Sequence, residues 1–173
     1  MNSEEIKKYI RDIPDFPEKG IIFRDITTVL NNGEVFGAVI DAMAEEVRKM
    51  NPDFVAAVDS RGFIIAAPIA YKLGLPFVPI RKPGKLPYDT FSESYSLEYG
   101  TNTVEIHTDA MSKGKRGVIA DDLIATGGTL AAAVKLIERI GCEVAGIAAF
   151  IELLDLKGRD LLKDYNVFTL VKY

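Results

Sequence analysis

Short apolar runs alternate with amphipathic helical patterns along most of the chain, and this alternation limits the possible folds more than any other feature. Helical stripes cover residues 35–50 and 130–140, and a third over residues 63–73 contains Pro68, which predicts a kink. The pattern predicts βαβ units in an α/β fold, with an open, mainly parallel five-stranded sheet and helices on both faces. The five expected strands are almost continuously apolar, as parallel strands covered on both faces should be, and they span residues 54–58, 77–80, 118–120, 144–151 and 167–171.

The segment before the first expected strand does not follow this alternation. Residues 12–28 contain Pro14, Pro17 and Gly20, so they cannot form one regular element. We therefore expect residues 1–30 to form a small hood that caps the sheet.

The connection between the second and third strands is unusually long. It begins with a stretch rich in Pro, Gly and Lys at residues 81–90. Residues 94–97 and 103–107 then alternate between polar and apolar side chains, which is typical of antiparallel strands. The sequence therefore predicts a flexible antiparallel flap over residues 81–107.

Length and composition narrow the class of protein. The 173 residues fit one domain, and a net charge of −4 argues against a broad basic surface for nucleic acid. The chain contains no apolar run near the roughly 20 residues that a membrane-spanning helix needs, and residues 1–11 lack the apolar core of a secretory signal. We therefore expect a cytoplasmic protein without nucleic-acid or membrane partners. The single cysteine, Cys142, suits a small buried hydrophobe.

Polar clusters follow three of the expected strands. They are Asp-Ser-Arg-Gly at residues 59–62, Arg-Lys-Pro-Gly-Lys at 81–85 and Asp-Asp-Leu-Ile-Ala-Thr-Gly-Gly-Thr at 121–129. In open parallel sheets, ligands bind beyond the carboxyl ends of the strands, near the point where the strand order reverses. The three clusters are therefore expected to meet on one rim and to form the functional site.

The third cluster has the chemistry of a sugar-phosphate site. Asp121 and Asp122 are expected to leave the buried strand, and the Thr-Gly-Gly-Thr turn at 126–129 then opens a helix. Free N–H groups at a helix start, a glycine backbone and threonine hydroxyls together bind phosphate, whereas the carboxylates suit sugar hydroxyls or Mg²⁺. The lysine of a Walker A loop is missing, so a P-loop ATPase is not indicated. Taken singly, each half could equally be an ordinary strand-to-helix turn and an N-cap.

Residues 118–129, with the sequence Val-Ile-Ala-Asp-Asp-Leu-Ile-Ala-Thr-Gly-Gly-Thr, resemble the phosphoribosyl-pyrophosphate signature of the type I phosphoribosyltransferases. Six further segments are similar to those of the adenine-specific members of that family: residues 16–17, 20–26, 59–63, 80–87, 94–100 and 156–159. The resemblance spans nearly the whole chain. It implies transfer of the phosphoribosyl group from 5-phosphoribosyl-1-pyrophosphate (PRPP) to adenine, which gives AMP and pyrophosphate. It also implies a homodimer and Mg²⁺ that is bound mainly through PRPP.

The resemblance also implies roles for individual residues. Ribose and its 5-phosphate would be bound by Asp121, Asp122, Ala125, Thr126, Gly127, Gly128 and Thr129. Pyrophosphate would be bound by Asp59, Ser60, Arg61, Gly62, Arg81, Lys82, Lys85 and Tyr99, with a cis peptide bond between Asp59 and Ser60. Adenine would lie beside Ile22, Phe23 and Arg24. The catalytic residues would be Glu98, which handles the purine proton, and Arg61, which contacts the leaving pyrophosphate; no protein ligand of the metal is assigned.

Without the resemblance, several of these residues have plainer interpretations. The basic run at 81–85 could be a solvated loop, Phe23 could be packed in the core and Glu98 could lie on the surface. Three other functions also stay open: a phosphoribosyltransferase for another purine such as xanthine or hypoxanthine, a regulator that binds nucleotides without catalysis, and a flavodoxin-like binding protein. The last of these does not explain the paired carboxylates and the basic flap.

Overall fold

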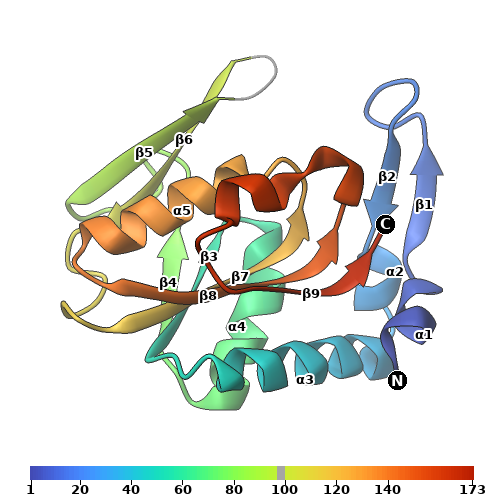
Figure 1. The fold of residues 1–173 in the computed structure, drawn as a ribbon, viewed down its shortest axis with the longest axis horizontal. Helices are drawn as coiled ribbons and strands as arrows, with labels where there is room; N and C mark the ends of the chain where they lie inside the picture. The colour runs from blue at the N-terminus through green and yellow to red at the C-terminus, as the bar shows by residue number, and fades with distance from the viewer. Residues whose placement is uncertain (97–99) are drawn as a thin grey trace.

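A five-stranded parallel sheet forms the centre of the fold, with the strand order β4-β3-β7-β8-β9 (Figure 1). The computed structural model describes residues 1–96 and 100–173. All neighbouring strands run parallel, so their carboxyl ends share one edge. The predicted sheet is therefore confirmed, with strands β3 (Phe54–Val58), β4 (Phe77–Ile80), β7 (Arg116–Ile124), β8 (Glu143–Glu152) and β9 (Val167–Lys172).

Helices cover both faces of this sheet, as the apolar runs predicted. They are α3 (Gly33–Lys49), α4 (Arg61–Leu73) and α5 (Gly128–Arg139). Successive side chains of a strand point to opposite faces, and β3 shows the result. Val55 and Ala57 pack in the core with α3 and α4, whereas Phe54 and Ala56 pack in the second core with α5. The sheet is thus buried on both sides and holds its carboxyl edge in a fixed position.

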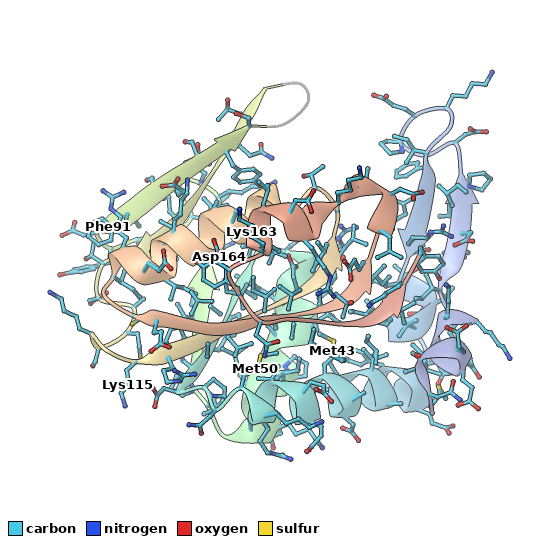
Figure 2. The ribbon with its side chains drawn as sticks, viewed as in Figure 1. Met43, Met50, Phe91, Lys115, Lys163 and Asp164 are labelled. Atoms are coloured by element: carbon cyan, nitrogen blue, oxygen red, sulfur yellow. The ribbon has the colours of Figure 1, made fainter. Side chains whose placement is uncertain are left out.

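The packing of α3 illustrates how closely the layers fit. Met43 and Met50 lie between this helix and the sheet (Figure 2), and Met43 is fully buried. Each fully buried side chain of this size contributes about 1.5–3 kcal/mol. Gly146 of β8 leaves room for the thioether, because a Cβ atom there would lie 2.5 Å from the sulfur of Met50.

Helix α4 continues through Pro68 without interruption in its assignment. Proline removes one hydrogen bond of the helix, but Ile65 and Ile69 on either side of Pro68 are fully buried. Burial of this helix face outweighs the missing bond, so the helix extends from Arg61 to Leu73. It ends at Gly74, whose φ of 66° is left-handed, as is common after a helix.

The N-terminal segment forms the predicted hood. It contains α1 (Ser3–Lys7), β1 (Arg11–Pro14), β2 (Ile22–Asp25) and α2 (Thr27–Leu30). Strands β1 and β2 pair in an antiparallel sheet of their own. The Nζ atom of Lys7 donates a hydrogen bond of 2.6 Å to the carbonyl of Lys172, so the hood is attached to the outer strand β9.

The long connection after β4 forms the predicted antiparallel flap, with strands β5 (Thr90–Ser96) and β6 (Thr101–His107). Figure 1 shows the hood and the flap standing on either side of the carboxyl edge of the sheet. Two short 3₁₀ segments, η1 (Leu154–Leu156) and η2 (Gly158–Leu162), follow β8 at this edge. Within residues 1–96 and 100–173, no helix has both the length and the apolar character needed to cross a membrane.

Candidate active site

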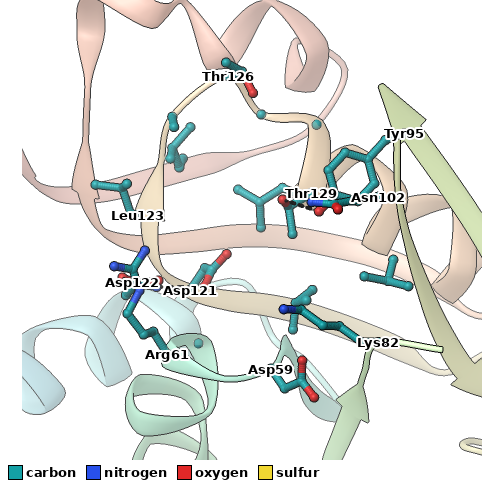
Figure 3. A pocket seen from close by; sticks show the side chains of 18 of the residues that line it. Asp59, Arg61, Lys82, Tyr95, Asn102, Asp121, Asp122, Leu123, Thr126 and Thr129 are labelled. Atoms are coloured by element: carbon teal, nitrogen blue, oxygen red, sulfur yellow. Dashed lines mark hydrogen bonds and ion pairs between the residues drawn. The ribbon is translucent and has the colours of Figure 1, made fainter. Parts of the chain in front are cut away.

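A cavity of about 640 Å³ lies at the carboxyl edge, where β3 and β7 are neighbours (Figure 3). The strand order reverses here, because the chain places β4 on one side of β3 and β7 on the other. The three polar clusters that were expected to share one rim all contribute to the lining, together with the flap. The lining includes residues 58–62, 82–83, 95, 101–104 and 121–130.

Asp121 and Asp122 lie within β7, so our prediction that the strand ends at Ala120 was wrong. The strand continues because its partner β8 also continues, and the pairing extends to Ile124 opposite Glu152. Both carboxylates line the cavity and are only 7% exposed. They therefore project from a rigid strand rather than from a loop.

Burial gives these two carboxylates unusual acidities. Burial, and next the negative charge of Asp122, raises the pKa of Asp121 well above its ordinary value. Burial also raises the pKa of Asp122, although the positive charge of Arg61 opposes the change. The backbone N–H of Asp122 donates to Oδ1 of Asp121 at 2.9 Å. A ligand that offers hydroxyl donors or a cation would compensate the cost of holding both charges here.

Arg61 places a positive charge beside these carboxylates, at the bottom of the cavity (the cavity floor). Its Nε atom lies 2.9 Å from Oδ2 of Asp122, and almost half of its side chain is exposed. It begins α4, directly after the Asp59–Ser60 peptide bond, which is cis as the resemblance implied. Gly62 follows, and a Cβ atom there would lie 2.7 Å from Oδ1 of Asp121. Glycine is needed at this position because the start of α4 approaches the carboxylate so closely.

The loop from residue 125 to residue 129, called the phosphate loop below, opens α5. Gly127 occupies the N-cap with a left-handed φ of 84° and offers no side-chain cap. The first N–H groups of a helix lack partners within the helix, and here they belong to residues that line the cavity. The positive end of the helix dipole adds to them, so the loop can bind a phosphate monoester without a lysine.

The phosphate loop rests on the turn between η1 and η2. A Cβ atom on Gly127 would overlap the carbonyl oxygen of Gly158, and one on Gly158 would overlap the carbonyl oxygen of Ala125. Each glycine therefore permits a backbone-to-backbone contact that no other residue allows. Residues 156–159 are among the segments that carry the family resemblance, but their contact with the phosphate loop was not predicted.

Arg159 fixes this turn to the ends of β8 and β9. Its guanidinium contacts both carboxylate oxygens of Glu152, at 2.6 and 2.9 Å, and donates to the Val167 carbonyl and the Thr169 hydroxyl. Burial raises the pKa of Glu152, but hydrogen bonds from Arg159 and Thr169 outweigh it and hold that pKa below its ordinary value. The buried carboxylate therefore stays ionised and bound to Arg159.

The basic loop after β4 reaches the cavity with one of its three cations. Lys82 belongs to the lining, whereas Lys85 is exposed outside it. Arg81 forms an ion pair of 2.9 Å with Asp59, so its charge is partly neutralised in this state.

The chain matches the phosphoribosyl transferase domain model over residues 25–173. It is 53% identical over 173 residues to the adenine phosphoribosyltransferase of Desulfitobacterium hafniense, with 100% of both chains covered. The chain belongs to the adenine phosphoribosyltransferase family. The crystal structure of the family member from Thermoanaerobacter pseudethanolicus has a TM-score of 0.96 and 50% identity, covering 99% of this chain and 100% of that one. The Saccharomyces cerevisiae enzyme, crystallised with adenine and an imino-altritol bisphosphate, has a TM-score of 0.93 and 37% identity, covering 97% of each chain.

The residues expected to bind the base in this family lie beside the cavity lining rather than in it. Ile22, Phe23 and Arg24 belong to strand β2 of the hood. The ring of Phe23 lies 5.6 Å from the guanidinium carbon of Arg61, which connects the hood to the cavity floor. The guanidinium of Arg24 instead stacks on the ring of Tyr173 at 3.8 Å. Glu98 and Tyr99 lie outside the described residues.

Several side chains of the flap line the cavity and were not predicted from the sequence as site residues. Thr101, Asn102 and Thr103 face the cavity from β6, and Tyr95 faces it from β5. The hydroxyl of Thr129 donates a hydrogen bond of 2.9 Å to the hydroxyl of Tyr95. The alternating pattern predicted the strands but gave no signal for which of their side chains would meet the phosphate loop.

Proposed function

We propose that this chain transfers the phosphoribosyl group from PRPP to adenine, releasing pyrophosphate and forming AMP. The observation that carries the proposal is the arrangement of three kinds of group around one cavity. A buried carboxylate pair lies between an uncapped helix N-terminus and the exposed cation of Arg61. A pentose with a phosphate on one side and a pyrophosphate on the other is complementary to this arrangement.

In this proposal the phosphate loop, Ala125 to Thr129, holds the 5-phosphate, while Asp121 and Asp122 accept hydrogen bonds from the ribose hydroxyls. The support is electrostatic. Two buried carboxylates repel a phosphate but attract hydroxyl donors, whereas the helix start attracts the phosphate. The sugar is thereby oriented with its anomeric carbon toward Arg61 and the turn of residues 59–62.

Pyrophosphate is proposed to lie over that turn, in contact with Asp59, Ser60, Arg61, Gly62 and Lys82. Breaking the bond between the anomeric carbon and the pyrophosphate oxygen leaves positive charge on the sugar and negative charge on the leaving group. Arg61 and Lys82 stabilise the negative charge, and a closed cavity would exclude water that could attack the sugar. Arg81, Lys85 and Tyr99 complete the assignment to pyrophosphate that follows from the resemblance.

The site fits a Mg²⁺ ion that takes most of its ligands from the substrate. The described residues contain no group of three or more His, Cys, Asp or Glu side chains that could hold a metal alone. The cavity floor does offer the carboxylate oxygens of Asp121 and Asp122, and oxygen is the ligand that Mg²⁺ prefers. When bound, the ion would neutralise part of the charge of the leaving pyrophosphate.

Adenine is proposed to bind between the hood and the cavity, beside Ile22, Phe23 and Arg24. The support is the position of Phe23 near Arg61 at the cavity floor. The base must lose a proton when its ring nitrogen joins the sugar, and Glu98 is proposed to handle that proton. The yeast relative, whose crystals contain adenine, is consistent with this choice of base.

The proposal includes a homodimer. Ile64 and Tyr71, two turns apart on the same side of α4, are 39% and 89% exposed, and association of two copies would cover such a surface. Sedimentation equilibrium will measure the mass in solution, and a monomer at micromolar concentration would contradict this part. The cytoplasmic location expected from the sequence stays a prediction.

The test of the proposal is a comparison of free bases with PRPP and Mg²⁺. We expect AMP and pyrophosphate to form in equal amounts from adenine, with far slower transfer to hypoxanthine or xanthine. Arg61→Met should abolish most turnover, whereas Lys163→Gln, an exposed change outside the cavity lining, should leave it unchanged. Preference for an oxopurine would point to another purine substrate, and nucleotide binding without transfer would point to a regulator; either result would overturn the proposal.

A further inference from the structure

Strand β5 of the flap lies along helix α5 and contacts it at four places. The two segments run in opposite directions, so that residues near the end of β5 meet the start of α5 and the earlier residues of β5 meet its end. Four residues of a strand and about nine residues of a helix have a similar length, so contacts can continue from one end of the pair to the other. The contacts are Tyr95 with Thr129 at 2.9 Å, Glu93 with Lys135 at 2.8 Å, Ser92 with Arg139 at 3.2 Å and Phe91 with Arg139 at 4.5 Å.

The contact of Tyr95 differs from the others because it reaches the functional site. Figure 2 labels Phe91 near the start of β5, whereas Figure 3 shows Tyr95 beside Thr129 at the cavity. Both Tyr95 and Thr129 line the cavity. The aromatic ring lies over Gly128, where a Cβ atom would be 3.0 Å from Cδ2 of the tyrosine. The flap thus contacts the phosphate loop directly, through a threonine that lines the cavity.

The hydrogen bond between the two hydroxyls can run in either direction, and a bound phosphate would select one of them. A hydroxyl has one donor and two acceptor positions. In the structure, Thr129 donates to Tyr95. A phosphate dianion only accepts hydrogen bonds, so Thr129 must turn its O–H toward a bound phosphate, and Tyr95 can then donate to the freed oxygen of Thr129. This forms a chain from the Tyr95 O–H through the Thr129 O–H to the phosphate, and each bond in such a chain strengthens the next.

We propose that Tyr95 is a positioning residue, which orients the hydroxyl of Thr129 toward the 5-phosphate and thereby couples the flap to occupancy of the phosphate subsite. The inference rests on the proposed function only in that it takes the ligand to be a sugar phosphate. The proposal also predicts that Tyr95 affects the binding of some ligands and not of others. Ribose 5-phosphate uses this hydrogen-bond chain, whereas pyrophosphate, bound at the other end of the cavity, does not.

The test is isothermal titration of the full chain with ribose 5-phosphate and, separately, with pyrophosphate and Mg²⁺. Tyr95→Phe keeps the ring over Gly128 and removes only the hydroxyl. We expect it to weaken ribose 5-phosphate binding by about 3- to 10-fold, as loss of one hydrogen bond does, and to change pyrophosphate binding less than 2-fold. In turnover, KM for PRPP should rise while KM for adenine stays unchanged. Equal weakening of both ligands, or of neither, would overturn the inference.

Lys135→Met is the matched control, because it removes another contact between β5 and α5 without touching the phosphate loop. If it weakens ribose 5-phosphate binding as much as Tyr95→Phe does, the tyrosine merely anchors the flap and the inference fails. A double-mutant cycle adds an independent measurement. In a Thr129→Val background, Tyr95→Phe should cause no further loss, and additive losses would contradict a shared chain. Thermal unfolding of each variant will confirm that it is folded.

These measurements separate the inference from the proposed function. If the binding pattern is as expected but no AMP is formed from adenine and PRPP, the proposed function fails and the positioning role stands. If AMP is formed and Tyr95→Phe has the KM values of the parent chain, the positioning role fails and the function stands. Failure of the parent chain to bind ribose 5-phosphate would overturn the inference.

Discussion

Replacing Gly158 by alanine tests whether the turn after β8 supports the phosphate loop. The added Cβ atom would overlap the carbonyl oxygen of Ala125 and would lie 2.8 Å from Cγ2 of Ile124 and 3.1 Å from the nitrogen of Gly127. Two of these three atoms belong to the backbone, so a change of side-chain rotamer cannot relieve the contact. We expect the loop to move away from the turn, and its N–H groups to move with it.

The free-energy cost of the added carbon can be estimated from other substitutions that overfill a packed site. Inserting one carbon into a well-packed site costs about 1–3 kcal/mol. Because each 1.4 kcal/mol or so corresponds to a factor of ten, a cost borne by the binding conformation of the loop raises Kd for ribose 5-phosphate about 5- to 150-fold. Isothermal titration measures the affinity, and thermal unfolding measures any loss of stability.

Gly37→Ala is the matched control for this change. Gly37 lies inside α3, and a Cβ atom there meets no atom within 4 Å. Its replacement should leave the affinity unchanged and stabilise the helix by up to about 1 kcal/mol. The reasoning is refuted if Gly158→Ala binds ribose 5-phosphate as the parent does, or if it lowers only the unfolding temperature, because the turn would then have moved instead of the loop.

Two further changes test the buried charges. Asp121→Asn should abolish most transfer from PRPP, yet raise the unfolding temperature of the ligand-free chain at pH 7. Burial and Asp122 raise the pKa of Asp121, so its ionised form destabilises the fold, and the gain of the variant should vanish as pH falls toward the ordinary value of 3.8; a variant less stable than the parent at pH 7 would contradict this. Arg159→Met should destabilise the chain by at most about 3–5 kcal/mol, because Glu152 loses its partner while buried. Since the pKa of Glu152 is lowered, that ion pair stabilises the fold above about pH 4.5 and the stabilisation is lost as pH falls through the lowered pKa. Thermal unfolding of the first variant and urea unfolding of the second, each at pH 7 and pH 4, measure these effects, and a difference between Arg159→Met and the parent that is independent of pH would refute the second.

The strands of the sheet were predictable because burial on both faces leaves a continuous apolar run. The runs at 54–58 and 77–80 coincide with β3 and β4. The third strand was predicted too short, at 118–120, because two carboxylates looked like its end. In the structure the neighbouring strand β8 continues past them, and backbone pairing with it extends β7 to residue 124. Strand length here depends on a partner that is distant in sequence, so local composition could not reveal it.

The convergence of the polar clusters was also predictable, because parallel strands share a carboxyl edge. What packs beneath and beside those clusters was not. Gly158 resembles an ordinary turn glycine until its contact with Ala125 is known, and Arg159 resembles a surface cation until its four hydrogen bonds are known. Tyr95 occupies a strand whose alternation indicates only which side chains share a face. Docking of one element on another is set by the three-dimensional fold and leaves no local pattern.

The direct pairing of β3 with β7 has a consequence for how the chain folds. These two strands supply the cavity floor, yet β4 and the whole flap separate them along the chain. Contacts between strands so far apart in sequence form slowly, so under the proposed function the sugar-phosphate site is completed late in folding. A sugar phosphate that binds the folded chain and not the unfolded one would then stabilise it in proportion to the logarithm of the ligand concentration.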